Sequence, residues 1–185
     1  MTDQTRIEGE RIYLRRVRES DLDDRYLSWF QDAELVKYFS GSKRSFTRES
    51  LLAEIREGER SETSYLYGVF LKDSDVCIGN IRLGPITREH KISDLVVLIG
   101  DRSQQGKGLA VEAIRLGNRV AFELHDLRKL FGGMYEANEA SIKAYTRAGW
   151  VIEGRLRGHY WVDNKPMDRI LVGCFNPKYF PDEAA

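Results

Sequence analysis

Two glycines stand one residue apart within residues 104–110, and this spacing suits the binding of an anion. Gly106 and Gly108 let the backbone turn tightly with φ above zero, so successive N–H groups can point into one concavity. A strand-like apolar run, residues 95–99, precedes them, and a helix-like run, residues 109–124, follows. The N–H groups therefore lie at a helix N-terminus, where unpaired donors and the macrodipole favour a phosphate. An ordinary strand-to-helix turn with glycines for packing shares this short pattern.

A second segment, residues 138–150, combines a helix cap, a tyrosine and a glycine stop. Asn138 is placed to cap a short helix, and Gly149 to end it at the C′ position. Tyr145 follows Ile142 by three residues, which puts both side chains on one face of that helix. By pattern alone, Asn138 is a capping residue and Tyr145 is an aromatic residue of the core.

The composition argues against several classes of protein. The 185 residues carry 29 Lys plus Arg and 29 Asp plus Glu, so nothing predicts long-range attraction to nucleic acid or to an anionic membrane. No apolar run approaches the roughly 20 residues of a membrane span, and residues 1–5 lack the apolar core of a signal peptide. We expect one domain over residues 1–185, with its core at about 9–175, because no repeat or linker divides the chain.

The cysteines and histidines form no recognisable framework. Cys77 and Cys174 lie far apart in strand-like runs, which is typical of reduced core residues in a cytoplasmic protein. His90, His125 and His159 lack the spacing of metal ligands, so no metal is expected.

The first half of the chain predicts strands and helices in alternation. Apolar residues alternate with charged ones in the strand-like runs, and capping residues precede the helical ones. The expected elements are a strand with Ile12, Leu14 and Val17, a helix capped by Ser20 or Asp21, a helix from Ser45 or Thr47 to Gly58, two strands over residues 65–71 and 76–83 joined by the turn 72–75, and a strand over residues 94–99.

The second half predicts the elements that complete a sheet. They are a helix with an apolar stripe from Leu109 to Leu124, a strand over residues 129–135 with two glycines inside it, the short helix after Asn138, and a hairpin that begins at Trp150, turns at Asp163 and Asn164 and ends with residues 167–175. A strand, helix, strand, helix segment within an otherwise antiparallel series makes a mixed α/β fold. We therefore expect a mostly antiparallel central sheet flanked by helices, with one parallel strand pair.

The segments 105–113 and 138–150, in this order and spacing, resemble the GNAT superfamily of acetyl-CoA-dependent N-acetyltransferases. Within it, the chain looks like the branch of ribosomal-protein N-terminal, spermidine and nucleotide-amino-sugar acetyltransferases. Further matches to that branch lie in residues 9–15, 29–32 and 153–157 and at Asp168, so the resemblance spans about residues 9–175. The chain departs from the family at Ser103, where Arg or Gln is usual. The glycines set the loop geometry, so pyrophosphate is expected to be held mainly by backbone N–H groups and by Lys107.

The resemblance implies how acetyl-CoA is held. In this superfamily the strand before the glycine loop splays away from the next strand, and the pantetheine arm pairs with the exposed backbone. One backbone N–H of that strand polarises the thioester carbonyl. The corresponding positions here are Leu98, Ile99, Gly100, Gln104, Gln105, Gly106, Lys107, Gly108, Leu109, Ala110, Asn138, Ser141 and Lys143. The side chains of Leu98 and Ile99 can pack in the core while their backbone groups bind the cofactor, and Lys143 can equally be a solvated charge.

The same resemblance makes Tyr145 the acid that protonates the departing thiolate of coenzyme A. A phenol of pKa about 10 gives a proton to a thiolate of pKa about 8.5 only in favourable geometry, so position matters more than acidity. The amine must lose a proton before it attacks, to a carboxylate such as Asp94 or Glu136 or to ordered water. Glu112, in the first turn after the glycine loop, is expected to complement the helix dipole.

The reaction implied is direct attack of a primary amine on acetyl-CoA, with both substrates bound together and no covalent enzyme intermediate. A small amine-bearing acceptor, an amino sugar or a polyamine, is expected, because aromatic residues gather near the acceptor side of a chain without charge bias. The residues expected to line its pocket are Trp29, Tyr38, Phe39, Asn80, Arg82, Tyr160 and Trp161. Aromatic residues at such positions are also common in a core. A ribosomal-protein N-terminus as acceptor and a non-catalytic acyl-CoA sensor are the alternatives, and a homodimer is compatible with the resemblance.

Overall fold

The computed structural model describes residues 6–38 and 46–183, and these form one eight-stranded sheet with helices on both faces. The strands are β1 (Ile7–Glu8), β2 (Ile12–Arg16), β3 (Tyr65–Leu71), β4 (Cys77–Thr87), β5 (Ile92–Ile99), β6 (Lys129–Tyr135), β7 (Val151–Val162) and β8 (Lys165–Phe175). Their order across the sheet is β1-β2-β3-β4-β5-β6-β8-β7. β5 and β6 run parallel, and the other neighbours in this described sheet are antiparallel. The predicted sheet type is confirmed.

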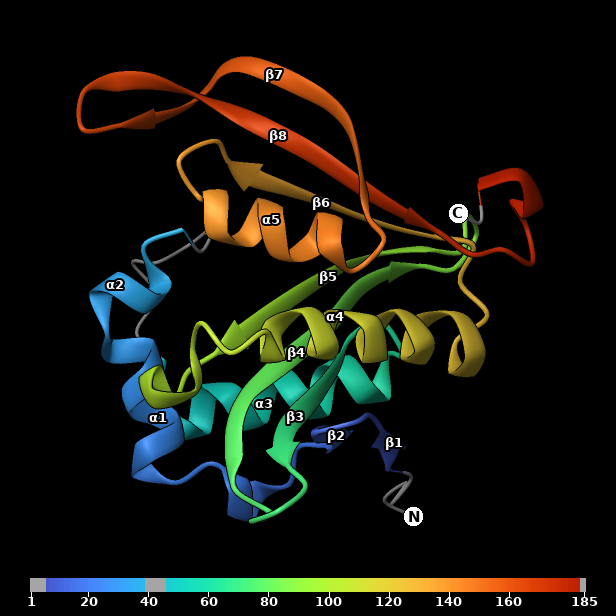
Figure 1. Cartoon of the computed structure of the whole chain (residues 1–185). Coiled ribbons are helices and arrows are strands. Elements are labelled where there is room, and N and C mark those ends of the chain that lie inside the picture. Colours follow the sequence, from blue (N-terminus) through green and yellow to red (C-terminus); the bar gives the residue numbers. More distant parts are fainter. Residues whose placement is uncertain (1–5, 39–45, 184–185) are drawn as a thin grey trace.

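The helices pack in two layers, with α4 in front of the sheet and α3 behind it in Figure 1. They are α1 (Asp24–Gln31), α2 (Ala33–Val36), α3 (Arg48–Arg60), α4 (Leu109–Arg119) and α5 (Glu139–Arg147), with a π-helical turn over Val120–Leu124 and 3-10 turns over Glu19–Asp21, Arg102–Gln104 and Pro181–Glu183. α4 and α5 pack in one core cluster that includes Ile12, whereas α1 and α3 pack in a second that includes Tyr13. Neighbouring residues of a strand thus reach opposite faces, as its period of two requires.

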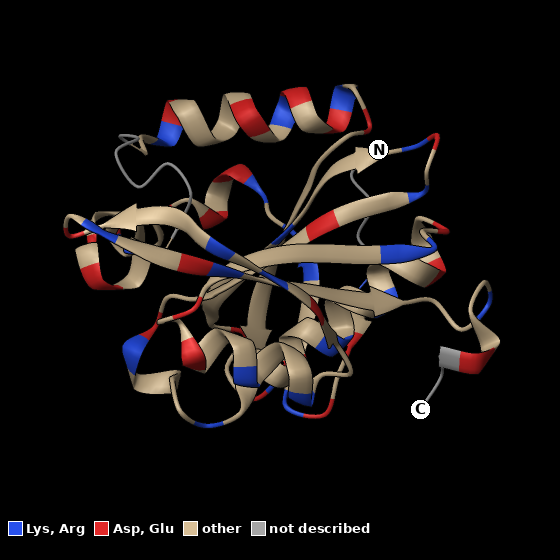
Figure 2. Ribbon diagram, turned by 90° about the horizontal axis from the view of Figure 1, so that it is seen from above, with Lys and Arg blue, Asp and Glu red and all other residues tan. Residues whose placement is uncertain are grey.

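Charged residues of both signs are interspersed along the helices and strands (Figure 2). No helix among the described residues is long and apolar enough to cross a bilayer. The same residues contain no cluster of three or more His, Cys, Asp or Glu side chains that could hold a metal ion. Cys77 and Cys174 are free and buried, as predicted, and burial raises the pKa of each thiol to about 11.

The first helix, α1, begins later than predicted. Its cap is Asp23, whose side chain accepts a hydrogen bond from the N–H of Tyr26 at 2.7 Å. Asp21 is engaged elsewhere, because its carboxylate accepts two hydrogen bonds from Arg15, at 2.7 and 2.8 Å. Both aspartates suit a cap by type, and the ion pair with β2 decides between them.

The predicted end of α3 at Gly58 is also wrong. The helix begins after the predicted cap Thr47 and continues to Arg60. A Cβ at position 58 would lie 2.7 Å from the carbonyl oxygen of Ser64. Glycine at this position therefore permits close packing of the helix on the chain that leads into β3.

The parallel pair separates soon after it forms. The last paired position of β5 and β6 joins Asp94 to Phe131. β5 then continues to Ile99 and β6 to Tyr135 without pairing with each other, and Figure 1 shows the two strands diverging. The predicted splay is confirmed, and it leaves a gap between the two strands.

Candidate active site

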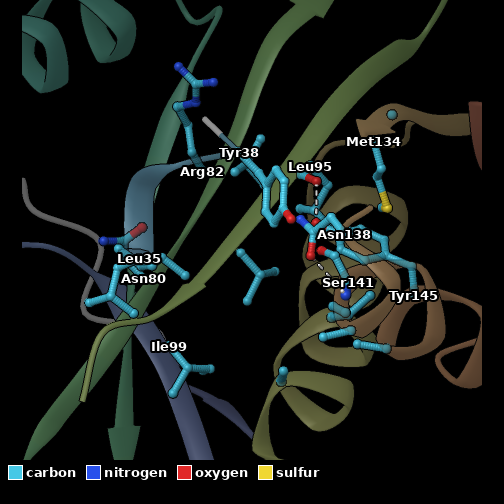
Figure 3. Close-up of a pocket in the computed structure, with 18 of the residues that line it drawn as sticks. Leu35, Tyr38, Asn80, Arg82, Leu95, Ile99, Met134, Asn138, Ser141 and Tyr145 are labelled. Carbon is cyan, nitrogen blue, oxygen red and sulfur yellow. Dashed lines mark hydrogen bonds between the residues drawn. The ribbon is translucent and has the colours of Figure 1, made fainter. Parts of the chain in front are cut away.

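A cavity of about 1030 Å³ occupies the gap between β5 and β6 and extends to residues of α2 and α3. Its wall includes the glycine loop, the separated ends of the two strands and the first turns of α5. Figure 3 shows Ile99 of β5 on one side, and Asn138, Ser141 and Tyr145 on the other. The two segments singled out in the sequence therefore face one common space.

The glycine loop has the backbone conformation that its sequence predicts. Gly106 and Gly108 have φ angles of +73° and +78°, and Gly108 immediately precedes α4. A Cβ at Gly106 would meet nothing within 4 Å, so the angle rather than the space calls for glycine there. The side-chain amide of Gln105 donates to the carbonyl of Ile99 at 2.9 Å and fastens the loop to β5. This holds the N-terminal N–H groups of α4 beside the cavity, where an anion is favoured.

Glu112 anchors this loop to β2. It lies in the first turn of α4, as predicted, and its carboxylate accepts hydrogen bonds from the N–H groups of Arg11 and Ile12, at 2.8 and 3.2 Å. The Arg11 side chain pairs with Glu112 at 3.0 Å and donates to the carbonyl of Lys107 at 2.8 Å. These contacts give Glu112 a structural role at the loop.

Ser103, the departure from the family pattern, closes the turn before the loop. Its N–H and its hydroxyl both donate to the Asp101 carboxylate, at 2.9 and 2.7 Å. Arg102 beside it is ion-paired with Asp32 at 2.6 Å. The turn is therefore stabilised by Asp101 within it and by Asp32 outside it, without the side chain that is usual at position 103.

The backbone of β5 presents alternate residues to the gap. The carbonyl of Leu95 accepts a hydrogen bond from Tyr145 across the gap, and that of Ile99 accepts one from the glycine loop. Because N–H and C=O directions alternate along a strand, Val97 between them also presents its backbone groups to the gap.

Leu98 and Gly100 present their backbone groups to β4 instead. A Cβ at Gly79 of β4 would lie 2.1 Å from the carbonyl oxygen of Leu98, and the N–H of Gly100 donates to the carbonyl of Ile78 at 2.9 Å. Of the three expected backbone contacts, Ile99 faces the gap, and Leu98 and Gly100 do not. The phase of this alternation is set by pairing with β4, which the local sequence does not reveal.

Tyr145 lies close to the point where the strands separate. Its hydroxyl donates to the carbonyl of Leu95 at 2.7 Å, and its ring meets Trp150 edge-on, with centroids 4.8 Å apart. Burial, reinforced by the negative charge of Asp94, raises the pKa of the phenol well above its ordinary value. The phenol therefore keeps its proton throughout the neutral range. Tyr145 both packs in the core and lines the cavity.

Asn138 caps α5 as predicted, accepting a hydrogen bond from the N–H of Ser141 at 3.3 Å. Both residues also line the cavity, as does Lys143, which pairs with Glu139 at 2.8 Å. The remaining predicted cofactor contacts that line it are Leu98, Ile99, Gln104, Gln105, Gly106, Gly108, Leu109 and Ala110. The side chain of Lys107 bonds to Gln104 at 3.1 Å and is not part of the wall.

The two candidate bases differ in position. Asp94 lines the cavity, and burial raises the pKa of its carboxyl, although the charges of Arg82 and Arg169 oppose the rise. Glu136 is ion-paired with Arg155 and lies outside the cavity wall. Of the two, Asp94 is the carboxylate that faces the site.

The residues predicted for the acceptor pocket divide into two groups. Tyr38, Asn80 and Arg82 line the cavity, whereas Trp29, Tyr160 and Trp161 do not; Phe39 lies outside the described residues. The side chain of Asn80 donates to Tyr26 Oη at 2.9 Å, and Arg82 pairs with Glu54 at 3.5 Å.

The three aromatic residues outside the wall have other surroundings. Trp29 is buried in the second core cluster, where a Cβ at Gly100 would lie 2.1 Å from its ring. Tyr160 stacks on Tyr135, with ring centroids 3.8 Å apart, and it is Tyr135 that lines the cavity. Trp161 on the edge strand β7 is 72% exposed. The positions of the aromatic residues in the sequence therefore did not indicate which of them line the cavity, which lie in the core and which lie on the surface.

The arrangement is that of an α/β protein with a cavity between two separated strands, with a helix N-terminus in its wall and a buried tyrosine close to the point where the strands separate. The acetyltransferase (GNAT) domain family matches residues 11–151, and the chain belongs to this family. It is an acetyltransferase by that membership.

Two relatives are N-acetyltransferases, and the first aligns over nearly the whole chain. The probable N-acetyltransferase YjcK of Bacillus subtilis is 24% identical over 176 residues, 92% of this chain and 97% of that protein. The spermidine N(1)-acetyltransferase of Escherichia coli K12 is 27% identical over 104 residues, 56% of this chain and 55% of that protein.

Solved structures have the same fold. The spermidine N-acetyltransferase of Vibrio cholerae, in complex with CoA and spermine, aligns with a TM-score of 0.81 and 19% identity over 93% of this chain and 99% of that one. The ribosomal-protein-S5-alanine acetyltransferase of Vibrio fischeri aligns with a TM-score of 0.79 and 21% identity over 95% and 98% of the two chains.

Proposed function

We propose that this acetyltransferase moves an acetyl group from acetyl-CoA to a primary amine of a small molecule, by direct attack in a ternary complex. The observation that carries the proposal is the continuous cavity that joins the α4 N-terminus, the free edge of β5 and Tyr145. The Vibrio cholerae relative was crystallised with CoA and spermine, which supports a CoA donor and an amine acceptor.

The residues around the gap fit an extended donor that carries a pyrophosphate. Positive φ at Gly106 and Gly108 directs backbone N–H groups toward the space before α4, where an anion is stabilised. The gap side of β5 offers the N–H groups of Val97 and Ile99 to a ligand that pairs as an added strand. The donor, when bound, supplies the activated acetyl group.

Three sets of groups then act on the reacting atoms. Asp94 accepts the proton that the acceptor ammonium must lose before it attacks. The N–H groups of Val97 and Ile99 stabilise the oxygen on which negative charge develops. As the C–N bond forms and the C–S bond breaks, Tyr145 gives its proton to the sulfur, and the proton that the attacking nitrogen then releases restores the phenol through solvent. The acetyl group passes directly to the nitrogen, so no side chain carries it.

The test is turnover of acetyl-CoA with a panel of primary amines, followed through the released thiol and by mass spectrometry of the acetylated product. The panel contains amino acids, polyamines, amino sugars and their phosphates. The proposal expects amine-dependent thiol release with one acetyl group added per thiol. Tight binding of CoA without turnover of any amine would instead support the alternative, a non-catalytic sensor.

A protein N-terminus is the competing acceptor, since a ribosomal-protein acetyltransferase shares the fold. Intact-mass analysis of ribosomal proteins incubated with enzyme and acetyl-CoA tests it. A small acceptor predicts no stoichiometric acetylation there. Complete acetylation of one protein N-terminus, with no turnover of small amines, would overturn the proposed acceptor class.

A further inference from the structure

The charges around the cavity are not those of a site for a polycation. Three of the carboxylates in its wall already pair with cations of the same wall. These pairs are Glu34 with Lys37 at 2.9 Å, Glu54 with Arg82 at 3.5 Å, and Glu139 with Lys143 at 2.8 Å. Among the described wall residues, Asp94 is the carboxylate left without an ion pair.

Arg169 also lines the cavity. Among residues 6–38 and 46–183, no carboxylate oxygen lies within 4.0 Å of a nitrogen of its guanidinium. It lies in the middle of β8, opposite Tyr135 of β6. Its Nε is buried and has no hydrogen-bond partner among the described residues, while Nη1 lies 3.4 Å from Nε2 of His159. The buried Nε lies against Gly133, whereas Nη2 is not fully buried and has no hydrogen bond to a described residue, so it is the donor that an oxygen of a ligand in the cavity can reach.

A glycine in β6 makes room for this guanidinium. A Cβ at Gly133 would lie 1.9 Å from Nε of Arg169 and 2.3 Å from Nη2. The side chain of Arg169 therefore lies against the backbone of the strand that borders the gap. This contact gives a reason for a glycine in the interior of a strand, where glycine is otherwise unfavourable.

Arg16 shows that burial of Nε alone does not indicate a ligand. Its Nε is also buried without a hydrogen-bond partner, but its guanidinium is ion-paired with Glu59 and lies outside the cavity wall. Arg169 differs in both respects, since it lines the cavity and has no such carboxylate among the described residues.

We propose that the acceptor is an amine that also carries an oxyanion, a carboxylate or a phosphate, and that Arg169 binds this oxyanion while the amine faces Asp94. The inference rests on the proposed function and names the chemical class of its acceptor. A guanidinium makes paired, charge-assisted hydrogen bonds to either oxyanion. Asp94 and Arg169 both line this cavity, so one acceptor molecule can engage both.

The experiment compares acceptors that differ only in the oxyanion. Ornithine with putrescine and phenylalanine with phenethylamine test the carboxylate; glucosamine 6-phosphate with glucosamine tests the phosphate. We expect kcat/KM to be roughly 10- to 100-fold higher for the anionic member of at least one pair, the usual range for hydrogen bonds to a charged group. The pair that shows the preference identifies which oxyanion is bound.

Two variants test the residue. Arg169→Gln removes the guanidinium, and Gly133→Ala keeps the arginine but displaces the end of its flexible side chain. In both variants, the ratio of kcat/KM for the anionic acceptor to kcat/KM for its neutral counterpart should fall toward one. Arg157→Gln is the matched control, because Arg157 is an exposed arginine on β7 outside the cavity wall, and this variant should keep the preference.

The outcomes separate this inference from the proposed function. Turnover of amines with no preference for the anionic member, or with spermidine preferred, would overturn the inference and leave the proposed function standing. If Arg169→Gln binds CoA more weakly in calorimetry but keeps the acceptor preference, the arginine binds the donor instead. That result would also overturn the inference. Binding of CoA without turnover of any amine would overturn both.

Discussion

The hydroxyl of Tyr145 donates a hydrogen bond to the carbonyl of Leu95, and its ring packs edge-on against Trp150. Tyr145→Phe therefore removes the proton donor and keeps the packing of the ring. We expect turnover of an amine to fall roughly 10²–10⁴-fold, the usual contribution of a general acid, with little change in the KM for acetyl-CoA. Steady-state kinetics with detection of the released thiol measures both quantities.

Tyr13→Phe is the matched control for this change. Tyr13 is also buried, and its hydroxyl donates to Asp75 at 3.0 Å, but it is not part of the cavity wall. Its turnover should remain near that of the wild type. If Tyr145→Phe stays within a few-fold of the wild type when chemistry limits the rate, the hydroxyl is not the acid.

Asp94 leads to a prediction about pH. Burial raises the pKa of its carboxyl above the ordinary value, and a base acts only in its ionised form. The kcat/KM should therefore fall as the pH drops through this raised pKa, at a higher pH than an exposed aspartate would give. Asp94→Asn should remove this acidic limb and lower kcat/KM roughly 10²–10⁴-fold. The pH profile of kcat/KM measures both effects.

Glu136→Gln is the control for Asp94→Asn, because Glu136 is an acidic residue that lies outside the cavity wall. Its pH profile should match that of the wild type. An acidic limb that persists unchanged in Asp94→Asn would belong to the acceptor amine, and the assignment of the base to Asp94 would then be wrong.

Single residues were predictable where a local motif fixed them. Asn138 caps its helix, and Gly106 and Gly108 have positive φ, because these roles depend on neighbours close in the sequence. Arg169 was not predicted, since its role depends on Gly133 of a strand far away in the chain. The pair of glycines within residues 129–135 was the available signal, and it indicated a close approach without naming the residue that approaches.

Elements were predicted best where both ends carry a signal. The strand over residues 129–135 and the short helix after Asn138 agree with β6 and α5. The start of α1 was missed because Asp21 and Asp23 are equally good caps, and only the ion pair of Asp21 with β2 separates them. The local sequence does not contain that partner.

The junction between the glycine loop and α4 supports a prediction about cofactor binding. Gly108→Val places a β-branched residue where φ is +78°, a conformation that costs an L residue about 1–2 kcal/mol. The N–H groups at the start of α4 should then lose their common direction. We expect the affinity for CoA to fall at least 10-fold in calorimetry.

Gly149→Val is the matched control for the loop. Gly149 also has a positive φ, +93°, with nothing within 4 Å of a Cβ placed on it, and it lies outside the cavity wall. The variant should lose a comparable amount of stability and keep its affinity for CoA. Unchanged CoA affinity in a folded Gly108→Val protein would contradict the assignment of the loop to the pyrophosphate.

The whole molecule has two parts of one sheet joined by a short ladder. β1 to β5 and β6 to β8 meet over three paired positions that end at Asp94. The hydrogen bond from Tyr145 to Leu95 and the packing of α4 against both β5 and α5 add to this connection. Periodicity in the sequence predicted both strands. Their early separation was expected from the family resemblance alone, since nothing in the pattern of residues 92–99 indicates where the partner strand departs.

A ligand that fills this gap should stabilise the molecule most where the two parts separate. We expect CoA to slow amide hydrogen exchange chiefly in residues 95–99 and 106–112, because the N–H groups of alternate residues of β5 and those at the start of α4 face the cavity and gain partners. Stability should rise by about 2.7 kcal/mol when CoA is present at 100 times its Kd. Hydrogen exchange followed by mass spectrometry, with thermal unfolding alongside, measures both effects. β1 and β2 contribute no residue to the cavity wall, so their amides should gain only the general increase in protection. Equal protection in all strands, or none in residues 95–99, would mean that the donor does not bind between β5 and β6.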